Sequence, residues 1–402
     1  MRALIITTGS RGDIQPFIAL ARGLIRAGHE PLLAAPRRFA PLAHPHGVPF
    51  AALDDSVLEL QGELAGKGTR AALTAAGKLK PLMRRWLDDL ASLADTPTDI
   101  VVYAPKTLGA PSLAERMDVP SLPALTIPLF QPTTHFPVPI AAARLPRVLN
   151  RPSWRLAGAV EAPWRGLVSR WREDALGLAG SAPSLTERIA ANGVLNAWSR
   201  HLLPAPTDWP AAARPLGFWP LAAEPDWRPP ERLTQFLDQG EPPVYIGFGS
   251  AVGRHPEKLT GTVLEALRLT GRRVIIATGW GALKASTEDK DVLFVDAVPH
   301  DWLLPRTAMA VHHGGVGTVA AAMRAGIPQI IKPFIGDQPF WARRVHALGI
   351  APPPLGRLTP ERLAASIDRA AGLADEARAL QALVKAENGI TAAVAAIEQA
   401  AE

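Results

Sequence analysis

Short uncharged apolar runs alternate with amphipathic stretches through the first third of the chain. Residues 3–8 (ALIITT) are apolar and rich in β-formers, which is typical of a strand buried on both faces. Residues 14–28 then place apolar side chains at helical spacing, and Gly28 is suited to end that helix. Further strands are predicted at 30–36, 48–53, 99–104 and 120–125. Strands that alternate with helices indicate a parallel sheet with right-handed crossovers.

Residues 126–175 break this rhythm, because they are rich in Pro, Arg and Trp and predict loops and short helices. Strand character returns at 193–198 (GVLNAW) and 215–220 (PLGFWP). The Pro-rich stretch that follows predicts an interdomain linker over 221–240. We therefore expect an N-terminal domain over 1–220 and a C-terminal domain over 241–402.

The alternation restarts in the second half of the chain. Strands are predicted at 243–250, 272–279, 292–297, 308–313 and 328–334. Residues 359–402 are Ala-rich and predict two or three helices, which we expect to be able to pack back on the N-terminal domain. The fold class is α/β, with two doubly wound domains facing each other across a cleft. Ligands of such sheets bind beyond the carboxyl ends of the strands.

Composition narrows the setting of this fold. The chain has 402 residues, 48% of them hydrophobic and 20% charged, which is a globular composition. No apolar run reaches the roughly 18 residues needed to cross a bilayer. The first residues meet Arg11 and Asp13 too early for a signal peptide. There is no cysteine, so disulfides, thiolate metal sites and a Cys nucleophile are excluded, and we expect a cytoplasmic protein.

The formal charge of +6 is uneven, because residues 141–172 carry seven arginines against Glu161 alone. Trp154, Trp164 and Trp171 are interleaved with them. A solvated helical face with anchoring tryptophans explains this pattern. A surface that makes peripheral contact with an anionic membrane at its inner face explains it as well. No recognised nucleic-acid-binding module accompanies the patch, so nucleic acid is not expected as a partner.

The segment HHGGVGT (312–318) joins a predicted strand to a predicted helix that ends at Gly326. Its glycines allow the backbone to turn sharply and approach a ligand closely. The first N–H groups of a helix lack partners and attract anions, and Thr318 or a histidine can add donors. A diphosphate fits this chemistry, although glycines that merely permit tight packing would give the same pattern.

Two other segments belong to the same predicted edge of the sheet. Asp337 and Gln338 follow the next strand, and a carboxylate beside an amide can bond adjacent sugar hydroxyls. Asp337 can equally cap the helix that starts at 338. The segment GFGS (247–250) ends the first strand of this domain and adds a second glycine-rich turn. Together these segments favour a diphosphate site, with groups suited to sugar hydroxyls beside it, over glycines that only permit tight packing.

HHGGVGTVAAAMRAGIPQIIKPFIGDQ (312–338) strongly resembles the nucleotide-sugar signature of the family 1 inverting glycosyltransferases, which have the GT-B fold of two Rossmann-like domains. TTGSRGDIQPFIALARGLIRAGHE (7–30) resembles their N-terminal opening. LPAPTDWP, GFW, ATGWGAL and VPHDWLLPR resemble the sterol glucosyltransferase and antibiotic glycosyltransferase branch. The resemblance covers nearly the whole chain. It implies transfer of a hexose from a UDP- or dTDP-sugar, as co-substrate and without a cofactor, to a lipophilic acceptor.

The resemblance also implies roles for single residues. His312 falls on the histidine that binds the diphosphate, and Asp337 and Gln338 fall on the pair that reads the sugar. The other donor-binding positions are Ser250, Val298, Gly314, Gly315, Gly317 and Thr318. Ala297 stands where plant members stack a tryptophan on uracil. Trp280 or Trp302 is the alternative side chain on which the nucleobase could stack.

The acceptor half is predicted from the N-terminal domain. Asp13 lies at a helix start at the carboxyl end of the first strand, where the resemblance implies the general base. The local pattern alone fits a helix cap equally well. His135 is a second candidate base, or a wall of the acceptor pocket. Phe130, Phe136 and Trp154 are the predicted walls for a flat hydrophobic acceptor, although aromatic residues in such a region are often core residues.

No metal ion is predicted. Asp289 and Asp291 form a D-x-D, but they lie in a polar, Lys-containing stretch that fits a solvated loop. Two rival functions remain open at this stage. A nucleotide-sugar epimerase would have the same architecture. A non-catalytic nucleotide-sugar-binding protein at a membrane surface would have the same donor site.

Overall fold

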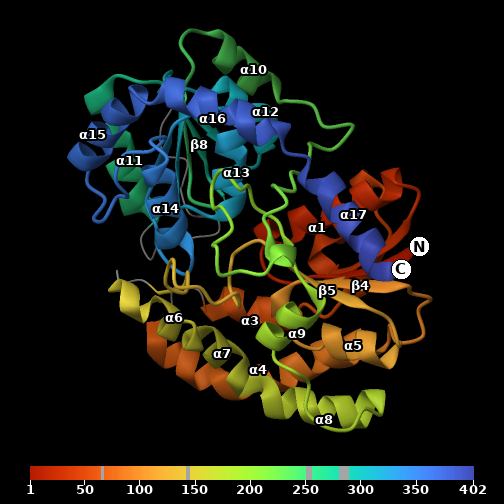
Figure 1. Ribbon diagram of the computed structural model, residues 1–402. Coiled ribbons are helices and arrows are strands. Elements are labelled where there is room, and N and C mark those ends of the chain that lie inside the picture. The colour runs from red at the N-terminus through yellow and green to blue at the C-terminus, as the bar shows by residue number, and fades with distance from the viewer. Residues whose placement is uncertain (65–67, 142–144, 250–255, 280–288) are drawn as a thin grey trace. The chain divides into compact units, whose positions relative to one another are not determined.

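The computed structural model describes residues 1–402 except 65–67, 142–144, 250–255 and 280–288. The side chains of 61, 64–76 and 256 are also outside the description. The chain divides into two compact units (Figure 1). Unit 1 comprises Met1–Arg200, Pro204–Leu221 and Asn388–Glu402. Unit 2 comprises His201–Leu203 and Ala222–Glu387.

Unit 1 is built on a parallel sheet of six strands in the order β3-β2-β1-β4-β5-β6. Their bounds are β1 Arg2–Ile6, β2 Glu30–Pro36, β3 Phe50–Leu53, β4 Ile100–Tyr103, β5 Ser121–Leu125 and β6 Leu195–Asn196. This is the doubly wound order, and its direction reverses between β1 and β4. The strands expected at 3–8, 30–36, 48–53, 99–104 and 120–125 are confirmed. Each could be predicted because it is a largely apolar run.

Helices cover the sheet of unit 1. Their bounds are α1 Arg11–Arg26, α2 Ala40–Ala43, α3 Ser56–Leu64, α4 Gly68–Ala91, α5 Ala110–Arg116, α6 Asn150–Ser153, α7 Arg155–Glu161, α8 Arg165–Leu176, α9 Leu185–Asn192 and α17 Gly389–Ala401. The last helix, α17, runs beside α1, so the two ends of the chain meet in one unit (Figure 1). Helix α8 packs against α4, and the segment 126–175 is made of loops and short helices as expected.

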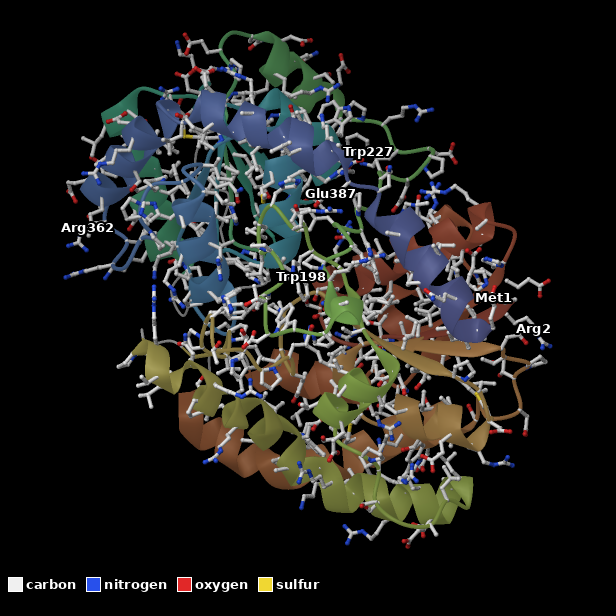
Figure 2. All side chains as sticks on the ribbon, viewed as in Figure 1. Met1, Arg2, Trp198, Trp227, Arg362 and Glu387 are labelled. Carbon is white, nitrogen blue, oxygen red and sulfur yellow. The ribbon has the colours of Figure 1, made fainter. Side chains whose placement is uncertain are left out.

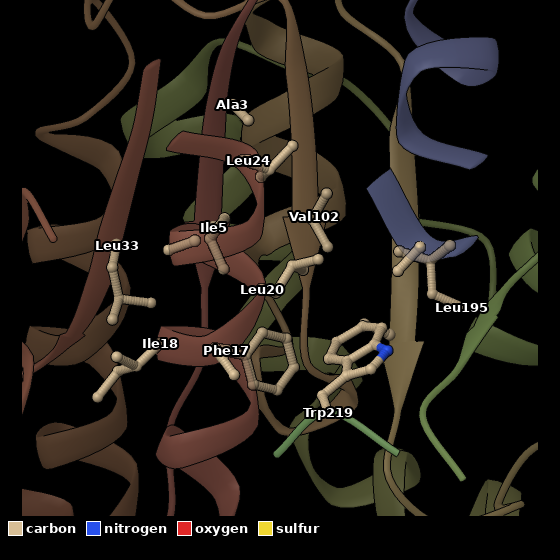
Figure 3. Close-up of a cluster of buried hydrophobic side chains, with 14 of the residues drawn as sticks. Ala3, Ile5, Phe17, Ile18, Leu20, Leu24, Leu33, Val102, Leu195 and Trp219 are labelled. Atoms are coloured by element: carbon tan, nitrogen blue, oxygen red, sulfur yellow. The ribbon is translucent and has the colours of Figure 1, made fainter. Parts of the chain in front are cut away.

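A hydrophobic cluster joins α1 to the sheet (Figure 3). Phe17, Leu20 and Leu24 of α1 point toward Val102 of β4, and the ring of Phe17 meets that of Trp219 edge-on with centroids 6.0 Å apart. Ala393, Val394 and Ile397 of α17 belong to the same cluster. A second aromatic cluster surrounds Trp198, which is fully buried in the interior of unit 1 (Figure 2). The first cluster holds α1, the helix whose start carries Asp13, against the sheet of unit 1.

Unit 2 contains a parallel sheet of five strands in the order β11-β10-β7-β8-β9. Their bounds are β7 Val244–Gly247, β8 Val274–Ala277, β9 Val292–Val295, β10 Met309–His312 and β11 Gln329–Ile331. The helices are α10 Glu231–Asp238, α11 Pro256–Thr270, α12 His300–Leu303, α13 Val316–Ala325, α14 Gln338–Ala347, α15 Pro360–Ala371 and α16 Ala374–Ala386. This sheet reverses direction between β7 and β10.

Three expectations differ from the structure. Residues 215–220 form no strand beyond a single bridge between Asn196 and Pro215, because Gly217 has φ +112° and the backbone leaves the extended conformation there. The second half of the expected linker 221–240 is helix α10. Of the C-terminal helices, only α17 joins unit 1, while α15 and α16 stay in unit 2. Within the described residues no helix is long and apolar enough to cross a membrane.

Candidate functional site

The carboxyl ends of three neighbouring strands of unit 2 carry the glycine-rich segments. His312 at the end of β10 pairs with Gly247 of β7 on one side and with Ile331 of β11 on the other. The loops that follow these strands therefore lie at one edge of the sheet. The site is centred where the strand order reverses, which is the preferred ligand position in open α/β sheets.

The turn between β10 and α13 starts a helix that has no side-chain cap among the described residues. Gly314 has φ +91°, and a Cβ there would lie 2.7 Å from Ile331 Cγ2, so only glycine fits. Gly315 is the N-cap and supplies no side chain to cap the first turn of α13. Gly317 is exposed, with open space where a Cβ would be. A free helix N-terminus approached by glycine backbone is suited to hold a phosphate group.

The structure places His312 in the interior of unit 2, at the end of β10. Its side chain is completely buried. Nδ1 accepts the Gly314 N–H at 3.1 Å, and Nε2 pairs with Oε1 of Gln329 at 3.0 Å. Burial lowers the pKa of His312 to about 3, so the ring is neutral. Both ring nitrogens are therefore bonded within the protein, and His312 holds the turn.

The neighbouring histidine, His313, is the one placed at the loops. Its side chain is only partly buried, and Nδ1 has no hydrogen-bond partner among the described residues. Cβ atoms at Gly249 and Gly315 would come within 3.0 Å of Cε1 and 2.5 Å of Nε2 of this ring. Two glycines thus make room for the imidazole between the loop after β7 and the turn after β10. Burial lowers the pKa of His313, which favours the neutral ring.

Asp337 and Gln338 are brought to the same edge by the loop after β11. Asp337 takes the N-cap position of α14, but its Oδ2 accepts from Nε1 of Trp341 at 2.7 Å and does not cap the helix. Oε1 of Gln338 accepts the N–H groups of Phe334 and Ile335 at 2.8 and 3.1 Å. These bonds fix the loop and the orientation of both side chains. The amide N–H₂ of Gln338 is the part that the loop does not use.

The remaining donor positions are less informative. Ser250 and Trp280 lie outside the described residues. Val298 is half-buried and packs against the core of unit 2. The ring of Trp302 already contacts Trp227, with centroids 5.3 Å apart, and lies under the guanidinium of Arg306.

In unit 1, Asp13 lies at the start of α1, beyond the carboxyl end of β1, and three groups orient its carboxylate. Oδ2 accepts from the backbone N–H and the hydroxyl of Ser10 at 2.8 and 2.9 Å. Oδ1 forms an ion pair with Nζ of Lys106 at 2.7 Å. A Cβ at Gly9, whose φ is +127°, would lie 2.4 Å from Oδ2. The carboxylate therefore caps the helix and also occupies a fixed position that depends on a glycine.

Lys106 was missed by sequence reasoning. It follows β4, and β4 pairs with β1 so that Tyr103 lies opposite Ile6. The loop after β4 must therefore emerge beside the loop that carries Asp13. The next residue but one, Leu108, has φ +42°, which is rare for a residue with a side chain. Such strain is often kept where a loop must present a particular group.

The structure places the expected walls of the acceptor pocket in the interior of unit 1. Phe130, Phe136 and Trp154 are all buried. Trp154 donates from Nε1 to the Phe136 carbonyl at 3.2 Å, and the two rings pack together. These residues form the core of the 126–175 segment, because an indole buried with its N–H paired is a stable packing unit. His135 is exposed, and its Nε2 pairs with the Thr207 hydroxyl at 3.0 Å.

The basic segment 141–172 is less uniform than its sequence indicates. Arg172 is buried and pairs with both carboxylate oxygens of Glu115 at 2.8 and 2.9 Å. The tryptophans are not exposed: Trp154 and Trp171 are buried and Trp164 is half-buried. The exposed basic part is therefore confined to fewer residues than expected, and tryptophan is not its apolar component.

Comparison with protein families gives a match for each unit. Residues 3–130 match the glycosyltransferase family 28 N-terminal domain. Residues 263–394 match the erythromycin biosynthesis protein CIII-like C-terminal domain. The two ranges together cover more than half of the chain and include Asp13, Lys106 and the glycine-rich segments after β10 and β11, but not the turn after β7.

Curated relatives and solved structures agree with these matches. The chain is 34% identical over 373 residues to a sterol 3-beta-glucosyltransferase of Arabidopsis thaliana, covering 88% of this chain and 58% of that protein. It is 34% identical to a sterol 3-beta-glucosyltransferase of Cryptococcus neoformans, covering 99% of this chain and 27% of that protein. The chain thus spans about a quarter to just over half of these relatives.

Among solved structures, spinosyn forosaminyltransferase SpnP superposes with a TM-score of 0.73 at 19% identity, with 100% of both chains covered. The glycosyltransferase VinC in complex with DTDP gives a TM-score of 0.68 at 20% identity, with 100% of this chain and 99% of that chain covered. At such identity these structures establish the two-domain fold and nothing finer.

Proposed function

Because this chain belongs to the family 1 glycosyltransferases of the GT-B fold, we propose that it transfers a hexose from a UDP- or dTDP-sugar to a hydroxyl of a lipophilic small molecule. The named relatives support a sterol-like acceptor, and the DTDP-bound neighbour supports a nucleoside diphosphate donor. The observation that carries the proposal is the glycine-capped start of α13, at the strand reversal of unit 2, beside the imidazole of His313.

In this proposal the diphosphate binds at the helix start, and His313 replaces His312 as the imidazole beside it. The backbone N–H groups and the His313 ring would stabilise the charge that develops on the leaving diphosphate. Asp337 and the amide N–H₂ of Gln338 would bond the hexose hydroxyls. Because Ala297 stands where plant members stack a tryptophan on uracil, another side chain must support the nucleobase here. Uridine and thymidine donors are therefore both proposed.

Asp13 is the proposed general base. It would accept the proton of the acceptor hydroxyl as that oxygen attacks the anomeric carbon, on the face opposite the diphosphate, which inverts the configuration. Ser10 and Lys106 hold the carboxylate in one orientation for this step. No step needs a metal ion in this scheme. We further propose that the reaction takes place in the cytoplasm, at a membrane surface that supplies the lipophilic acceptor.

The test is a mass-spectrometric screen of UDP-glucose and dTDP-glucose against mixed hydrophobic alcohols, with the Asp13→Asn variant beside the wild type. We expect a product one hexose heavier than its acceptor. In Asp13→Asn, turnover should fall at least about 10²-fold while nucleotide affinity stays unchanged. The control is Asp95→Asn, which changes an exposed aspartate of the same unit.

Each rival function gives a different result in the same screen. An epimerase would produce a sugar isomer or free nucleotide without any acceptor. A non-catalytic binding protein would retain the nucleotide and transfer nothing to any alcohol. Unchanged turnover in Asp13→Asn would remove this residue from the mechanism while leaving the donor site intact.

A further inference from the structure

Three consecutive short elements of unit 1 present an apolar and basic outer face. They are η4 (Arg147–Leu149), α6 and α7. Their exposed apolar side chains include Val148, which is 82% exposed, and Leu156, which is 51% exposed, together with Leu149 and Val160. Arg147, Arg151 and Arg155 are exposed between them. We call these seven residues the arginine–aliphatic surface.

The inner side of the same elements is firmly anchored, so the outer face does not result from a loosely packed segment. Asn150 is buried and donates to the Thr134 carbonyl at 2.8 Å. The buried hydroxyl of Ser153 accepts the Val138 N–H at 2.9 Å. Trp154 is buried with its indole N–H bonded to a backbone carbonyl. One side of the segment is thus fixed, and the other side turns aliphatic and basic groups to solvent.

The charge of this surface selects its partner. Residues 145–160 contain three arginines and no acidic residue. Leu156 and Val160 are four residues apart on α7, so they share one helix face. Aliphatic side chains alternating with cations suit the headgroup boundary of a bilayer that carries anionic lipid. No recognised nucleic-acid-binding module accompanies this surface, so a nucleic acid is not favoured, and an acidic protein would need a matching apolar face.

We propose that the arginine–aliphatic surface docks this protein on a membrane containing anionic phospholipid. The aliphatic side chains enter the headgroup boundary, and the arginines pair with lipid phosphates and carboxylates. This inference rests on the proposed function in one respect: docking on a membrane would give the enzyme access to its lipophilic acceptor. The surface itself is defined by exposure and charge within unit 1.

The experiment measures binding of the full chain to sedimented vesicles. One set contains phosphatidylcholine alone, and the other contains phosphatidylcholine and phosphatidylserine at about three to one. We expect binding to the second set only, weakened by salt. The triple variant Arg147→Gln, Arg151→Gln, Arg155→Gln should bind roughly 10²-fold more weakly, because each basic residue near an anionic surface contributes about fivefold. The pair Val148→Ser, Leu156→Ser should also weaken binding.

Matched controls come from unit 2. Arg232, Arg362 and Arg369 are exposed arginines, and Leu269 and Leu383 are exposed leucines. Replacing the three arginines by Gln, or the two leucines by Ser, should leave vesicle binding unchanged. Thermal unfolding of every variant checks that the fold persists. Absent binding by the wild type, or equal binding by all variants, overturns the proposal.

Two further readouts separate the alternatives. If the surface variants change the oligomeric state in light scattering and not vesicle binding, the surface joins copies of the chain and the proposal is wrong. Transfer to a water-soluble acceptor without vesicles should be the same in wild type and surface variants. Docking without any transfer would overturn the proposed function alone, and transfer without docking would overturn this inference alone.

Discussion

Two adjacent histidines have opposite environments in this protein. The ring of His312 is enclosed and bonded at both nitrogens, whereas the ring of His313 lies between two glycine-rich loops with Nδ1 unpaired among the described residues. The order of the two histidines in the sequence does not show which one lies at the loops. The end of β10 determines this, because His312 is the last strand residue and is held between the neighbouring strands β7 and β11.

This difference predicts the effect of His313→Ala. Removing the imidazole deletes one donor from the proposed diphosphate site, and kcat/KM for the nucleotide sugar should fall roughly 10²-fold. Steady-state kinetics and UDP titration calorimetry measure this, with His44→Ala, an exposed histidine of unit 1, as the control. Full activity and full UDP affinity in His313→Ala would show that the diphosphate lies elsewhere.

Lys106 makes a second prediction at the scale of residues. If its ammonium orients Asp13, then Lys106→Ala should lower kcat about 10-fold, which is less than the about 10²-fold cost of a 1 Å misplacement. KM for the nucleotide sugar should not change, because Lys106 and the donor site belong to different units. Lys106→Arg keeps the charge and should restore most of kcat. A raised donor KM, or an arginine variant as slow as the alanine variant, would contradict this positioning role.

At the scale of elements, helix α17 depends on a close approach at its first residue. A Cβ at Gly389 would lie 2.6 Å from the Gly217 carbonyl carbon and from the Phe218 oxygen, both of which are backbone atoms. Gly389→Ala should therefore destabilise the protein by about 1–3 kcal/mol, as overpacking does. Urea unfolding measures this. Gly261→Ala, in the exposed face of α11 with open space around it, should be neutral or stabilising; equal stability of the two variants would contradict a tight α17 contact.

Most elements could be predicted because their physical cause is local. Buried parallel strands are continuous apolar runs, so strands such as β1, β4 and β10 are visible in the sequence. Residues 215–220 look similar, but Gly217 has φ +112° and the backbone leaves the extended conformation after one bridge. Helix α10 was hidden in a Pro-rich segment, and nothing local indicates that α17 leaves unit 2. That choice depends on contacts between residues nearly 370 apart, such as Gly23 with Ile390.

The residues of the candidate site also divide into those with a local sequence signal and those without one. The glycine pattern, Asp13 and the Asp337–Gln338 pair could be found because motif and strand end coincide in the sequence. Lys106 could not, because its relation to Asp13 requires knowing that β4 pairs with β1. The sequence did not show that Phe130, Phe136 and Trp154 are buried, because aromatic content does not distinguish a core from a pocket.

At the scale of the whole molecule, the path of the chain has a practical consequence. Apart from His201–Leu203, unit 2 is one continuous stretch, 222–387, and the chain returns to unit 1 for its last helix. Unit 2 is therefore an insertion within unit 1. A chimera that exchanges donor specificity with a relative needs two junctions, one after Leu221 and one before Asn388. A single crossover near the middle of the chain would pair α1 with a foreign α17, and such hybrids should express poorly even when both parents are stable.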